Sequence, residues 1–421
     1  MTLTTRIVLA MIGGILGGAL IKLTHDSGIL GSTGDLILYD LLANGIFDIV
    51  GQIFIASLRL AIVPLVFFSL VCGVLSISSS SQIGTITIKT LSLYLVTTAI
   101  AISLALFFAL LVEPGLGANL ALPQAFVATD PPSLKQVIVS IFPTNPIAAM
   151  AEGNMLQIIV FSLLFGIALK GIGDSGKPLQ QSFQRLNDVI LKLVTMLIEL
   201  APYGVFSLLL TLFAVKGIGV IGDLSKYFFL LLFVLIFHAL VTYGLFITLI
   251  AKLNPFTFFS KLRSLSVFAF STSSSSATMP VTLRTVTTKL GVNPSIGSFT
   301  VPLGATVNMD GTAIMQGIAT VFIAQAYNID IAFSGYLMVV LTATLASIGT
   351  AGVPGVGLIM LTMVLQQVGL PVEGIALIIG VDRLLDMTRT AVNVCGDAMV
   401  SVVVAKSEKE FNESVFKDPS K

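Results

Sequence analysis

The sequence VDRLLDMTRTAVNVCGDAMV, residues 381–400, lies in a long apolar stretch near the end of the chain and decides the fold class. Five of its residues are ionisable, at positions 382, 383, 386, 389 and 397. A charge at the centre of a membrane helix opposes insertion by about 2.5–3.5 kcal/mol, whereas a leucine or valine favours it by only about 0.3–0.6 kcal/mol. These charges must therefore face a protein interior or an aqueous cavity rather than lipid.

The polar residues of this stretch fall on one helical face. They follow one another at steps of 4, 3, 4 and 4: Asp382, Asp386, Arg389, Asn393 and Asp397. That spacing forms a single stripe on a helix. The guanidinium of Arg389 offers a planar fork for a carboxylate, and Asp386 offers a partner for an ammonium group. The pair matches an amino acid with a second carboxylate. The alternative is that the charges only staple neighbouring helices together.

Composition places the whole chain in a membrane. Of 421 residues, 10% are charged and 55% hydrophobic, and the mean hydropathy is +1.01. A soluble domain has roughly 25% charged residues, so soluble and disordered classes are excluded, and a net charge of +1 excludes a nucleic-acid binder. The apolar runs are longer than the alternating segments of a barrel. We expect an all-α polytopic membrane protein.

Two apolar stretches are interrupted in the middle. Residues 255–285 contain Ser271 to Ser276 and Pro280, and residues 334–368 contain the glycine-rich run from Ser347 to Gly357. About a dozen apolar residues flank each interruption, too few to span twice. Each stretch is expected to be a hairpin that enters and leaves the membrane on one side, as at a transporter site. The alternative is a serine-rich surface loop and a glycine-rich linker.

A second polar interruption, Gly304 to Thr312, lies within the apolar run 294–326. Asn308, Asp310 and Thr306 offer oxygen atoms, and Gly311 is expected to let the helix unwind and expose carbonyl groups, which are ligands for hard cations. Together with Asn393 and Asp397 they could form a sodium site. The alternative is an ordinary kinked helix.

The remaining features predict little chemistry. Cys72 and Cys395 are far apart, and His25 and His238 are each isolated, which favours structural roles. No G-x-S-x-G or H-E-x-x-H motif occurs, which speaks against an enzyme. A retained first membrane helix is expected at 7–23, with G-x-x-x-G spacing within 13–18 that allows close helix approach. The alternative is that glycine is simply common in membrane helices. Half of the residues from 406 to 421 are charged, which predicts a solvated tail.

Four ordered motifs carry a family resemblance: SSSSATMP (273–280), NMDGTA (308–313), SIGTAGVPG (347–355) and DMTRTAVNVCGD (386–397). They resemble the dicarboxylate/amino acid:cation symporter family, which includes the excitatory amino acid transporters of animals and prokaryotic glutamate/aspartate transporters. PTNPIAAMAEGNMLQ (143–157) and APYGVF (201–206) also look like that family, so the resemblance covers nearly the whole chain.

The resemblance implies a homotrimer in the cytoplasmic (inner) membrane of a prokaryote. Each protomer is expected to have eight transmembrane helices, two re-entrant helical hairpins, inverted repeats and an elevator mechanism. The second hairpin would act as the gate, around residues 352–357. The implied division is a scaffold at 1–82 and 116–217, a mobile transport domain at 83–115 and 218–406, and a charged cytoplasmic tail at 407–421.

The resemblance also implies the site residues. Substrate contacts fall on Ser275, Met309, Thr312, Val353, Asp386, Arg389, Thr390 and Asn393. Three sodium sites fall on Gly304, Asn308, Asn393 and Asp397; on Thr306, Ser347, Ile348 and Thr350; and on Tyr94, Thr97, Thr98, Asn308 and Asp310. The expected function is sodium-coupled symport of L-aspartate or L-glutamate. Proton coupling, another amino acid or a dicarboxylate as substrate, and an anion-channel leak stay open.

The chain departs from the family pattern at several positions. Archaeal relatives have an arginine where this chain has Ser273, and animal relatives have one where it has Met387. We hypothesise that Arg383 replaces them by pairing with the acidic stripe. The proton-carrying glutamate of animal relatives corresponds to Gln316, whose neutral amide cannot carry a proton, and this favours sodium coupling.

Overall fold

The computed structural model describes residues 3–29, 31–76, 81–118, 139, 142–217, 220–347, 352 and 355–418. These residues form helices and turns, apart from one isolated β-bridge between Val292 and Phe411. The all-α class is therefore confirmed for the described part of the chain. In chain order its main helices are α1 (Leu3–Ser27), α2 (Gly31–Asp35), α3 (Asp48–Ser76), α4 (Ser81–Val112), α6 (Pro146–Glu152), α7 (Met155–Gly171), α8 (Lys177–Glu199), α9 (Ala201–Lys216), α10 (Val220–Phe237), α11 (Pro255–Thr272), α12 (Ser275–Thr288), α13 (Pro294–Val307), α14 (Asp310–Ala326), α15 (Phe333–Ser347), α16 (Val356–Gln367), α17 (Ile375–Ser407) and α18 (Glu413–Lys417).

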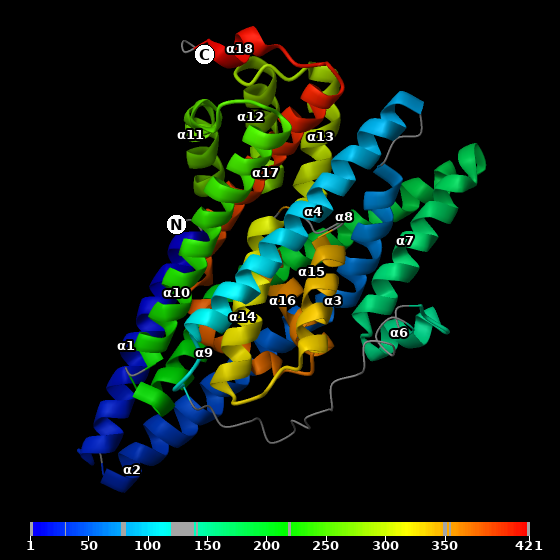
Figure 1. Cartoon of the computed structure of the whole chain (residues 1–421). Coiled ribbons are helices and arrows are strands. Elements are labelled where there is room, and N and C mark those ends of the chain that lie inside the picture. The colour runs from blue at the N-terminus through cyan, green and yellow to red at the C-terminus, as the bar shows by residue number, and fades with distance from the viewer. Residues whose placement is uncertain are drawn as a thin grey trace.

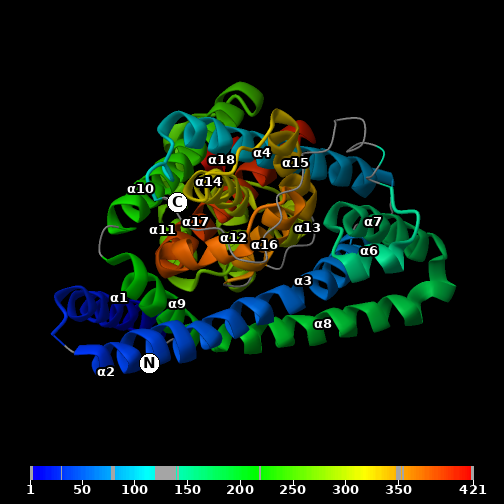
Figure 2. The same cartoon turned by 90° about the horizontal axis from the view of Figure 1, so that it is seen from below.

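An outer group of helices comprises α1, α3, α7, α8 and α9. Helix α3 packs against α7, α8 and α9, and α1 packs along α9. Seen from below, α3 and α8 extend side by side along one edge of the molecule (Figure 2). Many large apolar side chains of this group are exposed, for example Leu16 at 65% and Ile53 at 63%. An apolar exterior of this kind suits contact with lipid.

An inner group is built around α17. This helix packs against α10, α11, α12, α13 and α14, and α14 also packs against α4. In Figure 1 α17 runs through the middle of the molecule toward the end that carries α18 and the C-terminus. Every residue of α14 except Gln325 is buried, although Asp310 begins that helix. The inner group therefore holds its polar residues inside, where lipid cannot reach them.

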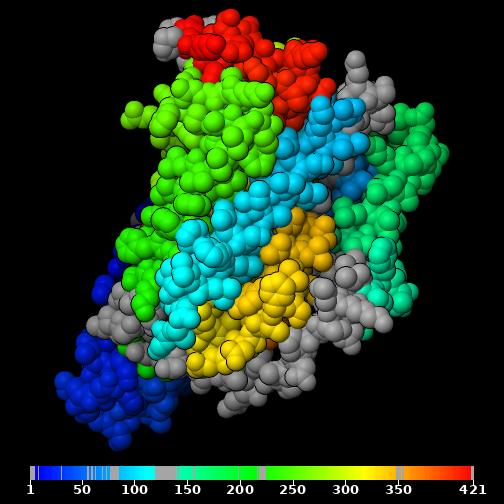
Figure 3. Space-filling view, viewed as in Figure 1, coloured from blue at the N-terminus to red at the C-terminus, as the bar shows by residue number. Residues whose placement is uncertain are grey.

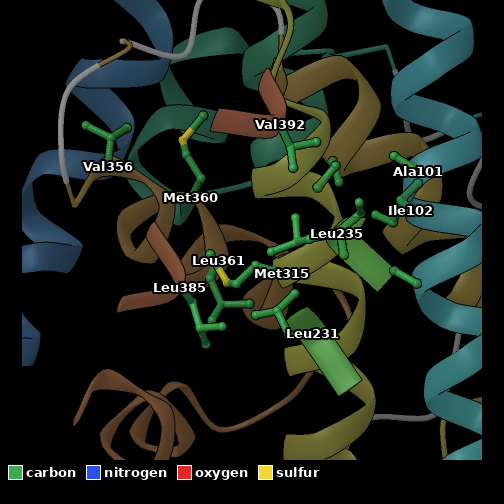
Figure 4. Close-up of a cluster of buried hydrophobic side chains, with 14 of the residues drawn as sticks. Ala101, Ile102, Leu231, Leu235, Met315, Val356, Met360, Leu361, Leu385 and Val392 are labelled. Atoms are coloured by element: carbon green, nitrogen blue, oxygen red, sulfur yellow. The ribbon is translucent and has the colours of Figure 1, made fainter. Parts of the chain in front are cut away.

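Apolar side chains surround the polar centre of the inner group. Figure 4 shows part of this shell, in which Met315 of α14, Leu361 of α16 and Leu385 of α17 lie together with residues of α4 and α10. Met315 and Leu361 are fully buried. A packed apolar shell keeps the local dielectric low, which strengthens the electrostatic interactions inside it.

The glycine spacing in α1 has the predicted effect. A Cβ on Gly14 would lie 2.7 Å from the backbone oxygen of Phe206, and a Cβ on Gly18 would collide with the backbone of Leu210. Both contacts are with α9, so the two helices approach backbone to backbone as small-x-x-x-small spacing allows. The predicted close approach of the first helix is confirmed.

Length and composition identify fewer membrane spans than the eight that the resemblance implies. Among the described residues they find Thr5–Ser27, Gly31–Phe54, Thr85–Val112 and Leu224–Ile250, and a pair bent by 45°, Gly173–Leu197 with Ala201–Val215, is a candidate fifth. Helix α17 fails this test because of its charges, and α13 and α14 fail because a break divides them. The expected eight spans stay a prediction. Of the expected connector at 113–135, residues 119–135 lie outside the described residues.

None of the charged side chains in the described residues 406–418 is buried, as a solvated tail requires, but the segment also packs against the rest of the protein. The side chain of Phe416 is 2% exposed, and the backbone of Asn412 donates to Gly291 O at 2.7 Å. Lys261 Nζ donates to the carbonyl oxygens of Val415 and Asp418 at 2.8 and 2.9 Å. Phe416 lies beside Lys261 of α11, and Phe411 forms a β-bridge with Val292, which follows α12.

Candidate functional site

The stripe on α17 is buried as a unit. Asp382, Asp386, Arg389, Asn393 and Asp397 are each at most 9% exposed. The charges therefore face protein, as the cost of exposing them to lipid requires. Arg383, one residue off the stripe, is only half-buried.

Arg389 is the most buried charge of the cluster, with 1% of its side chain exposed. Its Nη2 donates to Asp386 Oδ1 at 2.9 Å and forms an ion pair with Asp382 Oδ1 at 2.9 Å. Its Nε and Nη1 have no hydrogen-bond partner among the described residues. A buried guanidinium with two unsatisfied donors is costly unless a ligand completes it.

The free side of Arg389 points toward the start of α16. A Cβ on Gly357 would lie 3.1 Å from Nη1, so glycine leaves open the space next to this donor. Gly311 permits an equally close approach from the other side, because a Cβ there would lie 2.7 Å from the backbone oxygen of Arg389. Gly357 thus leaves room beside the guanidinium, and Gly311 lets α14 approach the backbone of Arg389.

A small cavity of about 20 Å³ lies next to Gly357 and Asp386, which both adjoin Arg389, although Arg389 itself does not line it. Six of the eight predicted substrate residues line it: Ser275, Met309, Thr312, Asp386, Thr390 and Asn393. Val353 lies outside the described residues. Ser273 and Gly357 also line the cavity, and sequence reasoning had not placed them there. A cavity of this size holds about one water molecule, so an amino acid enters only if the walls separate.

The N-terminus of α12 forms one wall of the cavity. Ser274 caps this helix by accepting from Ala277 N, and its Oγ donates to Gly352 O at 2.7 Å. Ser276 N donates to the same carbonyl at 3.2 Å. Ser273 has φ of 50° and a buried hydroxyl without a partner among the described residues. A helix N-terminus with free donors favours a bound carboxylate.

A second polar cluster joins the break between α13 and α14 to α17. Asn308 Nδ2 donates to Asn393 O and to Asp397 Oδ1, both at 2.8 Å. Asn308 Oδ1 is buried without a partner among the described residues. A Cβ on Gly304 would collide with Asp397 and with the hydroxyl of Tyr94. The first predicted sodium set, Gly304, Asn308, Asn393 and Asp397, is therefore brought together, and its oxygen donors suit a hard cation.

The helix breaks at a different residue from the one expected. Asn308 and Met309 are non-helical, with ψ of 96° and 41°, whereas Gly311 is the second residue of α14. Gly311 N donates to Asn393 Oδ1 at 2.7 Å. The role of Gly311 is thus close packing against α17 rather than unwinding, and the earlier expectation is wrong on this point.

The third predicted sodium set is only partly brought together. Thr98 Oγ1 donates to Asp310 Oδ1 at 2.6 Å, whereas Thr97 Oγ1 donates to Tyr94 O at 3.1 Å. Tyr94 OH donates to Thr300 O at 3.0 Å. The other partners of Asp310 were missed by sequence reasoning.

Those partners lie on the continuation of α10. Tyr243 OH donates to Asp310 Oδ2 at 2.9 Å, and His238 Nε2 lies 3.1 Å from the same oxygen. The sequence had suggested that His238 is isolated, but the structure places it beside Asp310. The sequence could have indicated that His238 has a partner, because a polar ring in a long apolar run needs a polar contact. Nothing in the sequence indicated which one.

The second predicted sodium set is not assembled by the described residues. Thr306 Oγ1 donates to Leu303 O at 2.9 Å, and Ser347 Oγ donates to Thr344 O at 2.7 Å, each within its own helix. Ile348 and Thr350 lie outside the described residues. Among the described residues no group of three or more His, Cys, Asp or Glu side chains forms a metal centre of the transition-metal type.

Arg383 joins the acidic stripe as hypothesised. Its Nη1 lies 3.3 Å from Asp386 Oδ2. Asp386 thus bridges two arginines, and Arg389 bridges two carboxylates. A second cavity of about 50 Å³ borders these charges, with Phe54 and Val205 of the outer group on its apolar wall. The charge network therefore lies where the outer and inner groups meet.

Comparisons with known proteins agree with this arrangement. The profile of the "Sodium:dicarboxylate symporter family" matches residues 3–407. The chain is 35% identical over 423 residues to the "Proton/glutamate-aspartate symporter" of Escherichia coli, covering 98% of this chain and 94% of that protein. It is 34% identical over 378 residues to the "Proton/sodium-glutamate symport protein" of Geobacillus stearothermophilus (86% and 88%). It is 30% identical over 416 residues to "Excitatory amino acid transporter 1" of Ambystoma tigrinum (85% and 76%).

Proposed function

Because the chain belongs to the sodium:dicarboxylate symporter family, we propose that it is a secondary active transporter that carries L-aspartate or L-glutamate together with sodium ions across the cytoplasmic membrane of a prokaryote. The family and the relatives compared above are membrane transporters rather than enzymes. The names of two relatives combine glutamate with protons or with protons and sodium. The substrate and the coupling ion must therefore be argued from this chain.

The single observation that carries the substrate assignment is the half-satisfied guanidinium of Arg389. Two of its donors lack partners, while Asp386 lies next to it in the cavity wall. A side-chain carboxylate bound to Nε and Nη1 would satisfy both donors in the fork geometry that arginine favours. The α-ammonium would pair with Asp386, and the α-carboxylate would lie at the N-terminus of α12. Three charged groups of an acidic amino acid thus meet three complementary groups.

Sodium coupling is supported by the cluster around Asp397. The free oxygen of Asn308, the carboxylate of Asp397 and the carbonyl groups at the helix break are oxygen ligands of mixed type, which suit a hard cation. Gln316, at a buried position in α14, adds no titratable group. A bound sodium ion at this cluster would hold α13 and α14 against Asn393, and Asn393 also lines the substrate cavity. Cation binding and substrate binding would then stabilise the same packing.

The transport cycle follows from the two helix groups. We propose that the outer group is the scaffold of a trimer and that the inner group moves against it as an elevator, with eight spanning helices and the α11–α12 and α15–α16 pairs as re-entrant hairpins. What supports this is that the charge network lies inside the inner group and borders the outer one. A rigid carrier that moves with its charges enclosed avoids exposing them to lipid.

Uptake into liposomes tests the function. Purified protein is reconstituted, and uptake of radiolabelled L-aspartate is measured with an inward sodium gradient, with a proton gradient in sodium-free buffer, and with a membrane potential alone. Concentrative uptake that requires the sodium gradient supports the proposal. Uptake with the proton gradient alone would establish proton symport instead, and flux that follows voltage alone would favour a channel.

A further inference from the structure

One end of the molecule carries an open basic groove of about 840 Å³ on α11. Four cationic side chains line it, and no acidic side chain does: Lys261, Arg263, Lys289 and Lys417. Ser260 and Ser264 add hydroxyl groups, and Phe256 and Val267 add apolar surface. This combination of charge, hydrogen-bond donors and apolar wall lies outside the substrate site and plays no part in the transport argument.

Most of the groove belongs to a long segment of the chain that carries basic but no acidic residues. Residues 224–309 contain six lysines and arginines and not one aspartate or glutamate. Excess basic residues near the ends of membrane helices mark the cytoplasmic side. The C-terminus and α18 lie at this same end (Figure 1), and α18 packs against α11. The groove therefore faces the cytoplasmic leaflet, whose surface is negatively charged.

The cations of the groove differ in how they are engaged. Lys261 donates to three carbonyl oxygens, those of Lys289, Val415 and Asp418. Lys289 Nζ donates to Ser264 Oγ at 3.1 Å, and Lys417 pairs with Glu413 at 2.9 Å. Lys261 thus builds the floor of the groove by joining α11, the end of α12 and the C-terminal segment, and the other cations project along its rim.

Arg263 is the side chain best suited to hold an anion. It is exposed, lines the groove and makes no hydrogen bond or ion pair with the described residues. A guanidinium presents a planar fork to phosphate oxygens. In the space-filling view the C-terminal segment caps the neighbouring helices at the top of the molecule (Figure 3), so the basic end is assembled from distant parts of the chain.

The apolar wall distinguishes a lipid from a free anion. Phe256 is 83% exposed and Val267 61% exposed, and the outward face of α11 continues with Phe268 and Phe270, each 42% exposed. Exposed phenylalanine and valine side chains of this kind suit contact with the apolar part of a lipid. From these observations we infer that the groove binds the phosphate of an anionic phospholipid from the cytoplasmic leaflet, with the acyl chains lying along α11.

Lipid binding to the purified full-length protein tests this inference. The affinities for dioleoyl-phosphatidylglycerol and for dioleoyl-phosphatidylcholine are measured by native mass spectrometry of protein released from detergent. Wild type is expected to prefer phosphatidylglycerol. Arg263→Gln should weaken that affinity about fivefold, as expected for one basic side chain at a membrane surface, and leave the phosphatidylcholine affinity unchanged. Arg263→Lys should retain most of the preference.

The matched control is Arg284→Gln, which removes an exposed arginine of α12 that does not line the groove. It should leave the preference intact. Equal weakening by both glutamine variants, or no effect of Arg263→Gln, would overturn the inference. Inorganic phosphate is added as a competitor at concentrations equal to that of the lipid. Full displacement of phosphatidylglycerol would identify a site for free phosphate and would overturn the lipid assignment, whereas retained lipid supports it.

Discussion

Helices α1 and α14 are both mainly apolar, yet they place their side chains in opposite ways. Helix α1 exposes Leu9, Leu16, Leu20 and Leu23, each by more than half, whereas α14 buries all but one of its residues and begins with Asp310. Length and hydropathy recognise α1 as a span and do not recognise α14. This difference shows that the outer helices can be recognised by the apolar side chains that they expose. The inner helices are recognised by the polar contacts that they bury.

The largest expected effect comes from the inner arginine. Truncating one partner of a buried, hydrogen-bonded charge pair costs about 2–5 kcal/mol, so Arg389→Gln is expected to weaken L-aspartate binding by roughly 100-fold. Isothermal titration calorimetry measures this affinity. The control is Arg185→Gln, which removes an exposed arginine on outer helix α8 and should bind like wild type. If the two variants bound aspartate equally well, the assigned role of Arg389 would be refuted.

The carboxylate next to the helix break is expected to give the second-largest effect. Asp397→Asn removes the charge beside Asn308 while keeping the shape of the side chain. Hydrogen bonds and contacts to a charged group contribute about 1.5–3 kcal/mol, so the sodium concentration for half-maximal aspartate binding should rise roughly tenfold or more. The exposed Asp174, in the turn before α8, provides Asp174→Asn as a control. An unchanged sodium requirement in Asp397→Asn would remove Asp397 from the proposed cation site.

The close contact between α14 and α17 is expected to give a smaller effect, on stability. A Cβ on Gly311 would lie 2.7–3.1 Å from backbone atoms of Arg389, which cannot move aside as a flexible side chain could. Overpacking of this kind costs about 1–3 kcal/mol, so Gly311→Ala should lower the unfolding temperature in detergent. In Gly244→Ala the new Cβ meets nothing closer than 3.9 Å, and the protein should be as stable as wild type. Equal unfolding temperatures would contradict the packing role.

The smallest effect is expected on the outer surface. Leu16 is 65% exposed on α1. Because substitutions away from packed or polar features change stability by less than about 0.5 kcal/mol, Leu16→Ala should alter neither aspartate affinity nor the unfolding temperature measurably. A loss comparable to that of Gly311→Ala would show that this face of α1 is packed against another part of the assembly.

The polar stripe of α17 was easier to predict from the sequence than the contacts that other helices make with each other. The stripe from Asp382 to Asp397 was readable because helical spacing and the cost of a charge in lipid act on one segment at a time. The pairing of Asp310 with His238 was not readable, because it joins helices 72 residues apart and depends on how they pack. The helix break was expected at Gly311 but lies at Asn308 and Met309, because a glycine in the sequence can indicate either unwinding or close packing.

The C-terminal segment shows the opposite limit of sequence reasoning. Its charge fraction predicted solvation, and its charged side chains are indeed not buried, but the packing of Phe416 and the contact of Lys261 with the backbone of the segment were not predicted. Average composition conceals two well-placed aromatic side chains. In α1 the spacing of the glycines indicated that a close helix approach was possible, and the structure shows it at Gly14 and Gly18, but the sequence did not name the partner α9.

The most direct test of the central claim is the affinity of purified wild-type protein for L-aspartate and L-glutamate, measured by titration calorimetry in sodium chloride and in potassium chloride at equal ionic strength and pH. If Arg389 binds the substrate carboxylate in a site that sodium at Asp397 and Asn308 completes, sodium should raise the affinity for at least one of the two by tenfold or more, about 1.4 kcal/mol. Equal affinities in the two salts would contradict sodium coupling. Absence of binding of either amino acid in both salts would contradict the substrate assignment itself.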